Sequence, residues 1–227
     1  MEERPPTKPQ SEALQVLATE HWSLLATRAL TYQESLGRVN MFLAILSGAV
    51  IALALIAQAD RFGTTFISVA IFMLAVVFFV GVATVQRLLM LNREDYRWVI
   101  GMNRIRHAYL EMHPELEPSF ITSPHDDMRG ALVTLGLDRV RFRAVGSVYH
   151  SLVTLPGMLG VVVAAVGAAI AGLAAAGFGA PVYLVLLAGA LGFAVALAML
   201  LWAQSRSFGS YGPVEASRFP TPHPKKS

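Results

Sequence analysis

Four apolar runs that contain no charged residue and no histidine restrict what this chain can fold into. About 20 helical residues span the roughly 30 Å of hydrocarbon in a bilayer, and each run reaches that length. Lipid offers no partners to free backbone groups, so such a run satisfies its own N–H and C=O groups as an α-helix. The runs are residues 39–59, 64–85, 156–176 and 182–203. The sequence therefore predicts an all-α polytopic membrane protein with four transmembrane helices, paired in hairpins at 39–85 and 152–203.

The positively charged residues outside these runs indicate how the helices are oriented. Lys and Arg number 4 in residues 1–38, 9 in 86–151 and 4 after 203, against 1 in 60–63 and none in 177–181. Cytoplasmic segments of membrane proteins carry the excess of Lys and Arg, so both termini and the central connection are predicted to be cytoplasmic. We expect a multi-pass protein of the plasma membrane, the inner membrane of a bacterium, with the lipid bilayer as its first partner.

Residues 11–38 are predicted to form a cytoplasmic amphipathic helix that follows a disordered leader at 1–10. The stretch contains no proline, and its apolar residues recur at steps of three and four, which is the period of one helix face. These residues are Leu14, Ala18, Trp22, Leu25, Ala29, Tyr32 and Leu36.

The cytoplasmic connection at 86–151 is predicted to be a helical region as well. An apolar stripe continues from the second transmembrane run as far as His113, where Pro114 disfavours helix in the residue before it. The sequence leaves open whether the first two transmembrane helices run unbroken into the cytoplasm.

The loop at 114–128 contains three prolines and several side chains of the types that bind metals. His107 and Glu111 come before this loop. They are four residues apart, so they lie on one helix face and are predicted to form an ion pair. No paired-histidine spacing accompanies them, so we expect a solvated surface and no metal site. The run His125-Asp126-Asp127 is predicted to cap a short helix through 128–136.

Basic and aromatic side chains near the third and fourth transmembrane runs predict contacts with lipid headgroups. Anionic headgroups attract basic residues near a membrane surface by about 1 kcal/mol each, and tryptophan favours the interface. The candidates are Arg139, Arg141, Arg143 and Trp202. The stretch 139–143 can be drawn either as part of an amphipathic helix or as a short strand. The residues from 204 to 227 are expected to form a disordered tail.

Small residues recur at every fourth position of the last two transmembrane runs. Such a face lets a second helix approach closely, which is how helices gain packing energy in lipid. The predicted helix-packing residues are Gly160, Ala164, Ala168, Gly172 and Ala176 in one run and Ala188, Gly192 and Ala196 in the other. They can serve packing within one hairpin or contact between copies of the chain, and both alternatives remain open at this point.

The sequence carries no arrangement of residues typical of an enzyme. Nucleophile elbows, phosphate-binding loops and zinc-peptidase motifs are absent, and the chain contains no cysteine. The basic residues are not interleaved with aromatic ones as in nucleic-acid-binding proteins. We therefore expect no enzymatic activity, no cofactor, no metal and no nucleic-acid partner.

Two resemblances accompany these observations. Residues 92–127 resemble a group of uncharacterised bacterial four-span membrane proteins, which implies a membrane location and no assigned activity. The segments that carry this resemblance are Asn92-Arg93-Glu94-Asp95, Gly101-Met102-Asn103-Arg104-Ile105-Arg106, Pro114-Glu115-Leu116 and His125-Asp126-Asp127. Residues 11–112 are similar in topology to SLATT-type two-span effector domains, which implies an oligomeric module that perturbs membranes or forms pores.

Two functions from different classes fit these features. The first is a homo-oligomeric membrane protein that surrounds a pathway for an ion or small solute. The second is a non-conducting scaffold whose cytoplasmic helices recruit a soluble partner. Solute flux through the purified protein in liposomes separates the two. The mass of the extracted complex is the most informative single measurement, because a strict monomer is incompatible with the first.

Overall fold

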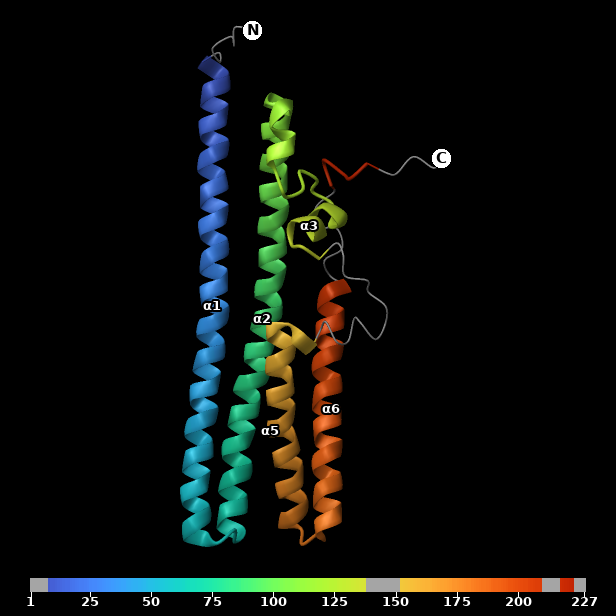
Figure 1. Cartoon of the computed structure of the whole chain (residues 1–227). Coiled ribbons are helices and arrows are strands. Elements are labelled where there is room, and N and C mark those ends of the chain that lie inside the picture. The colour runs from blue at the N-terminus through green and yellow to red at the C-terminus, as the bar shows by residue number, and fades with distance from the viewer. Residues whose placement is uncertain (1–7, 138–151, 210–216, 223–227) are drawn as a thin grey trace, which may run out of the picture. The chain divides into compact units, whose positions relative to one another are not determined.

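The computed structural model describes residues 8–137, 152–209 and 217–222, and every regular element in these ranges is a helix. The helices are α1 (Lys8–Asp60), α2 (Thr64–Met112), the 3-10 helix η1 (Pro114–Ser119), α3 (Met128–Thr134), α5 (Leu155–Gly177) and α6 (Val182–Gly209) (Figure 1). The predicted all-α class is confirmed for the part of the chain that is described. The predicted headgroup residues Arg139, Arg141 and Arg143 lie outside it.

Four of these helices, α1, α2, α5 and α6, are long and apolar enough to cross a membrane. Each contains one of the four uncharged runs of the sequence, so the prediction of four candidate spans is confirmed.

The first two candidate spans belong to helices that do not stop where the apolar runs stop. Helix α1 has 53 residues and α2 has 49, about twice the length needed to cross a bilayer. The amphipathic helix expected at 11–38 and the first span are therefore one helix, and it begins at Lys8, inside the expected leader. Gly37 lies in its interior, where a glycine costs only about 1 kcal/mol relative to alanine.

A tight turn joins α1 to α2, and Asp60 closes it. Its carbonyl accepts from the Gly63 N–H at 2.9 Å, and its carboxylate accepts from the Phe66 N–H at 2.7 Å. The same residue thus ends one helix and satisfies a free N–H group at the start of the next. Arg61 and Phe62 have positive φ angles of 47° and 63°, which lets the chain reverse within three residues.

The helices contribute to two compact units. Within the described residues, the first unit comprises 8–33, 92–137 and 217–222, and the second unit comprises 34–91 and 152–209. Helices α1 and α2 supply residues to both units, whereas α5 and α6 belong to the second alone.

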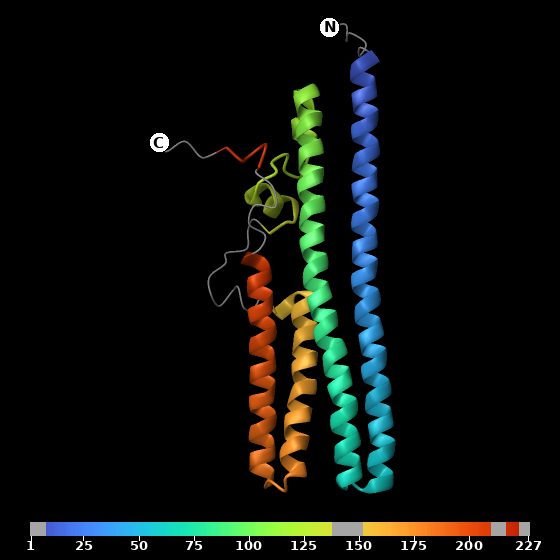
Figure 2. The ribbon, with the colours of Figure 1, turned by 180° about the vertical axis from the view of Figure 1, so that it is seen from behind.

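The core of the second unit is apolar and closely packed. Phe42 of α1 and Val163 of α5 are fully buried on either side of Gly81 of α2. A Cβ atom added to Gly81 would lie 2.6 Å from Val163 Cγ2 and 2.9 Å from Phe42 Cε2. The glycine therefore lets three helices meet at one level. In both views of this unit, α5 lies between α2 and α6 (Figures 1 and 2).

Helices α5 and α6 approach each other closely at Gly192, whose nearest neighbours on α5, Ala171 and Gly167, are not among the predicted packing residues. A Cβ atom on Gly192 would lie 2.7 Å from Ala171 Cβ and 3.1 Å from the Gly167 carbonyl oxygen. Gly160 faces Leu200, and Gly172 faces Val185. Ala164 and Ala196 are buried, and Ala168, Ala176 and Ala188 are half-buried. In the described chain these residues pack within one hairpin, and contact between copies through them stays a prediction.

Substitution of Gly192 by leucine is expected to lower the free energy of unfolding of the full chain by about 2–3 kcal/mol. The added side chain meets the backbone of α5, which cannot move aside as a flexible side chain can. Gly48→Leu is the matched control, because nothing lies within 4 Å of a Cβ atom added to Gly48. Unfolding of the purified chain in detergent, followed by circular dichroism, measures both variants. Equal destabilisation by the two substitutions would contradict the close α5–α6 contact.

Candidate functional site

A buried asparagine on α2 anchors the polar part of the first unit. The Asn103 side chain is fully buried, and its amide donates to the His125 carbonyl oxygen at 2.7 Å. Its own side-chain oxygen accepts from Arg106 Nη1 at 2.7 Å and from Thr134 Oγ1 at 2.9 Å. One residue of α2 is thereby tied to the loop before α3 and to the end of α3. Hydrogen bonds from a buried side chain restrict the conformations that such a loop can adopt.

Asp127 begins α3 in the way that the sequence predicts. It is the N-cap residue, and its carboxylate accepts from the Gly130 N–H at 2.8 Å. An aspartate at this position satisfies an N–H group that has no partner within the helix. The prediction that the His-Asp-Asp run caps a short helix is confirmed. The predicted pair of His107 and Glu111 is also present, at 3.4 Å.

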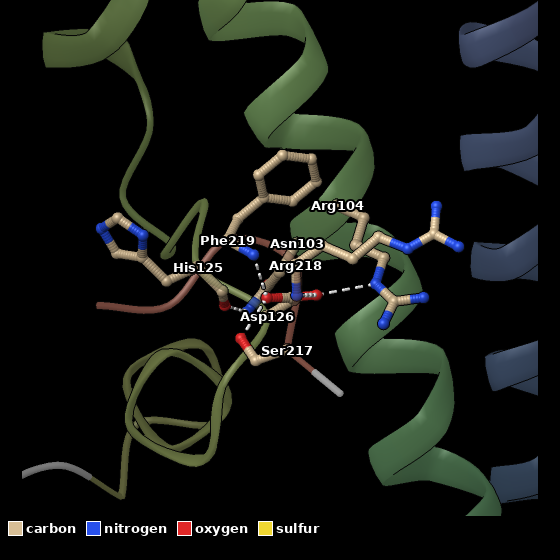
Figure 3. Close-up of polar contacts among 7 residues, drawn as sticks. All are labelled: Asn103, Arg104, His125, Asp126, Ser217, Arg218 and Phe219. Atoms are coloured by element: carbon tan, nitrogen blue, oxygen red, sulfur yellow. Dashed lines mark hydrogen bonds and ion pairs between the residues drawn. The ribbon is translucent and has the colours of Figure 1, made fainter. Parts of the chain in front are cut away.

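The adjacent residue, Asp126, receives hydrogen bonds from two distant parts of the chain. Its side chain is completely shielded from solvent. Arg104 of α2 donates from Nε at 2.8 Å, and Ser217 donates from its hydroxyl at 2.6 Å. The backbone N–H groups of Arg218 and Phe219 donate to the same carboxylate at 2.9 and 2.8 Å (Figure 3). Four donors thus converge on one buried carboxylate.

Residues 217–222 are consequently not the disordered stretch that we expected within 204–227. They lie along the loop before α3, and α6 also continues into the expected tail as far as Gly209. The Asp126 N–H donates back to the Phe219 carbonyl at 3.2 Å. Thr221 donates to Asp127 from its hydroxyl at 2.8 Å and from its N–H at 3.0 Å. We call residues 217–222 the docked segment.

An aromatic contact accompanies the hydrogen bonds of the docked segment. The Phe219 ring stacks on the His107 imidazole, with 3.8 Å between ring centroids and 22° between ring planes. Ser217, Phe219 and Thr221 therefore each have a side chain in contact with the site, and Arg218 and Pro220 lie between them. The contacts follow the two-residue period of an extended chain.

The negative charges of the Asp126 and Asp127 carboxylates suit the hydrogen-bond donors of the docked segment. Burial by itself raises the pKa of Asp126, but the hydrogen bonds from Ser217, Arg218, Arg104 and Phe219 outweigh it and hold that pKa well below its ordinary value. Burial likewise raises the pKa of Asp127. The hydrogen bonds from Gly130 and Thr221 lower it by more, so the pKa of Asp127 lies below its ordinary value. Both carboxylates are ionised at neutral pH, so they only accept, and the segment presents hydroxyl and N–H donors.

A second pair of helical segments in the first unit meets along a partly polar seam. Arg28 of α1 forms a bidentate ion pair with Asp95 of α2, with Nε–Oδ1 and Nη2–Oδ2 distances of 2.6 and 3.2 Å. The residues of α1 that are half-buried here are Leu14, Leu17, His21, Leu24, Thr27, Arg28 and Thr31. Burial and the charge of Arg106 lower the pKa of His21, so this seam contains a neutral imidazole.

The predicted apolar stripe of α1 lies mostly beside this seam, and of its residues only Leu14 is half-buried in the seam. Trp22 is 70% exposed, Tyr32 is 56% exposed and Leu25 is 40% exposed. Ala18 and Ala29, on the same face, are exposed as well. We call residues 18, 22, 25, 29 and 32 the α1 stripe. An amphipathic helix normally buries its apolar face, so this face of α1 has no cover within the described chain.

The remaining predicted site residue, Trp202, lies near the end of α6. It is 57% exposed, and the Arg206 guanidinium lies 3.9 Å from the centre of its ring. An exposed aromatic ring under a cation at the end of an apolar helix has the composition of an interfacial anchor.

Sequence reasoning missed the docked segment and the roles of Asn103 and Arg104. The available signal was weak: two prolines, Pro220 and Pro222, fix the backbone in an extended conformation. Among the described residues, His, Asp and Glu side chains form no group of three or more that could hold a metal ion. Comparisons with protein-family models, curated proteins and solved structures found no match to this chain.

Proposed function

We propose that this chain is an integral protein of the plasma membrane that works as a homo-oligomer, with both termini in the cytoplasm. Four helices long and apolar enough to span a bilayer support the membrane location. The excess of Lys and Arg in residues 1–38, 86–151 and 204–227 supports the orientation. Arg139, Arg141, Arg143 and Trp202 are proposed to lie at the headgroups.

The exposed α1 stripe is the observation that carries the oligomer. It lies N-terminal to the apolar run of α1, so lipid tails do not cover it on this topology. Exposed apolar surface that includes a tryptophan marks a site of protein–protein contact in water, and tryptophan is enriched among residues that dominate binding energy. A partner that covers Trp22, Leu25 and Tyr32 would remove this surface from water.

A second copy of the chain suits this stripe. No charged residue lies on the stripe, and the polar residues along its outer edge are Ser11, Gln15 and Gln33, so two identical faces meet without like-charge repulsion. Copies inserted in one membrane share a single orientation, which aligns their α1 helices in parallel. A two-fold contact then uses the same patch on both copies. Confinement to one membrane also raises the effective concentration of one stripe near another.

A pathway for ions or small solutes would have to run between copies. The core of the second unit is filled by apolar side chains, among them Phe42, Val77, Leu88 and Val163, each at most 2% exposed. Water and ions need polar partners, and the side chains of this apolar cluster provide none. We therefore place the proposed pathway at the interface between copies. Solute flux into liposomes that contain the purified chain tests this part of the proposal.

Disulfide cross-linking between copies tests the role of the α1 stripe. The chain has no cysteine, so a single introduced thiol reports on one position. Ala29→Cys, on the stripe, is expected to form a covalent dimer in oxidised membranes, because two-fold related side chains on a contact face come within disulfide reach. Ser23→Cys is the matched control: Ser23 is exposed on the same helix but points away from the stripe.

Glutamate substitutions give the complementary measurement. Trp22→Glu is expected to shift the nanodisc-extracted chain towards monomer, because it buries a charge in the contact. Val16→Glu, at a residue 68% exposed on another face, should leave the mass unchanged. A wild-type chain that is strictly monomeric, together with equal cross-linking at positions 23 and 29, would overturn the proposal and favour the non-conducting scaffold.

A further inference from the structure

The docked segment is held by contacts that resemble those of a bound peptide more than those of a folded core. The apolar cluster of the first unit is made by Tyr96, Val99 and Ala131, with Ile100 and Leu135 packed against it. The segment therefore contributes no side chain to the apolar cluster of this unit.

The contacts of the segment also discriminate between sequences. The hydroxyl at position 217 is bonded to Asp126, the ring at 219 stacks on His107, and the hydroxyl at 221 is bonded to Asp127. Three side chains at alternate positions are recognised, and one backbone pair fixes the register. Main-chain hydrogen bonds combined with pockets for alternate side chains are a general mode of peptide recognition.

The site can also remain charged when no segment is present. Arg104 is bonded to Asp126 from α2 at 2.8 Å and does not belong to the segment. Asp127 keeps its bond from the Gly130 N–H, which is local to α3. Neither carboxylate loses every partner when the segment leaves, so the open site carries no isolated buried charge of the kind that makes breaking an ion pair costly.

From these contacts we propose that His107, Arg104, Asp126 and Asp127 form a binding site for an extended Ser-X-Phe-X-Thr segment of a partner protein. The chain's own residues 217–222 occupy this site and act as its built-in competitor. The partner is recognised by its chemistry: a hydroxyl, an aromatic ring and a second hydroxyl at alternate positions, with free N–H groups between them. Because residues 217–222 are tethered to the site, their effective concentration there is high. A partner therefore binds when its own local concentration is high or when the docking of residues 217–222 is weakened.

A labelled synthetic peptide tests this site on the full-length chain. The probe is fluorescein-labelled Glu-Ala-Ser-Arg-Phe-Pro-Thr-Pro-His, the sequence of residues 215–223, and the readout is fluorescence anisotropy with protein in nanodiscs. The variant Phe219→Ala/Thr221→Ala weakens the own segment and leaves the site residues unchanged. We expect this variant to bind the peptide at least about 10-fold more tightly than the wild-type chain, because the internal competitor is removed.

Two controls make the assignment specific. The same peptide with alanine in place of phenylalanine should bind the double variant at least about 10-fold more weakly, and this control needs no further change in the protein. Adding Asp126→Asn to the double variant should abolish binding of the unmodified peptide. Equal binding of the two peptides, or equal binding by wild type and double variant, would overturn the proposal. The two forms of the chain are also compared in nanodiscs that hold a single chain each. If wild type and double variant then bind the peptide equally, the competing segment comes from a second copy, and this result would also overturn the proposal.

Discussion

Replacing Asp126 by asparagine is expected to release residues 217–222 from the loop before α3. The carboxylate accepts from Arg104, from the Ser217 hydroxyl and from two backbone N–H groups, and its side chain has no exposure to solvent. Asparagine removes the negative charge and turns one acceptor into a donor, which then faces other donors. The segment supplies three of these hydrogen bonds, and one hydrogen bond to a charged group contributes about 1.5–3 kcal/mol, so the equilibrium constant for docking should fall by more than about 100-fold.

Amide hydrogen exchange measures this release directly. The N–H groups of Arg218, Phe219 and Thr221 donate to the two carboxylates, so they should be protected in the wild-type chain and exchange freely in Asp126→Asn. Glu117→Gln is the matched control, because it neutralises an exposed carboxylate of η1 in the same unit. Protection that persists in Asp126→Asn would show that the carboxylate does not hold the segment.

Substitution of Gly130 by alanine is expected to have the second large effect. A Cβ atom there would lie 2.1 Å from the His125 carbonyl oxygen and 2.7 Å from its carbonyl carbon. The loop cannot yield easily at this point, because the same carbonyl accepts the 2.7 Å hydrogen bond from Asn103. We expect a loss of about 3 kcal/mol or more in the stability of this region, with the N-cap bond from Gly130 to Asp127 broken.

The measurement for Gly130→Ala is exchange protection across residues 123–134, together with the Tm of the purified chain. Arg129→Ala serves as the control, since Arg129 is the exposed neighbour on the same short helix. Both readouts should be unchanged in the control. Wild-type protection in Gly130→Ala would mean that the turn before α3 can accommodate a side chain, contrary to the packing described above.

Local chemistry made part of this structure predictable. The candidate spans follow from charge-free runs alone, because lipid tolerates few other sequences at that length. The capping role of Asp127 and the pair of His107 and Glu111 follow from spacings of three and four residues along a helix. In each case the interacting groups are near neighbours in the sequence, and a single helix geometry brings them together.

The seam between α1 and α2 shows why other features were not predictable. Hydrophobic periodicity pointed to the stripe that contains Trp22 and Tyr32, yet α1 packs through a face that includes His21 and Arg28. A polar residue in a contact face gains its stability from one specific partner, here Asp95 for Arg28. That partner lies 67 positions away in the sequence, so no local pattern reveals it.

The docked segment illustrates the same limit at greater separation. Ser217 and Asp126 are 91 positions apart, and each reads in isolation as part of a polar loop. The segment contributes no residue to the apolar cluster of its unit, so hydrophobic patterning carries no information about it. Only the three-dimensional convergence of donors on one carboxylate distinguishes it from an ordinary polar tail.

The two hairpin turns have a consequence for how a stimulus could reach this protein. Three residues connect α1 to α2 and four connect α5 to α6, and each turn presents one aromatic ring, Phe62 at 69% and Phe178 at 92% exposure. Aromatic rings favour the headgroup region, so such turns suit the membrane surface better than the water beyond it. On the proposed topology, these two turns offer no surface in the external water to which a soluble ligand could bind. Phe62 and Phe178 would then fix the depth at which the two hairpins sit in the bilayer.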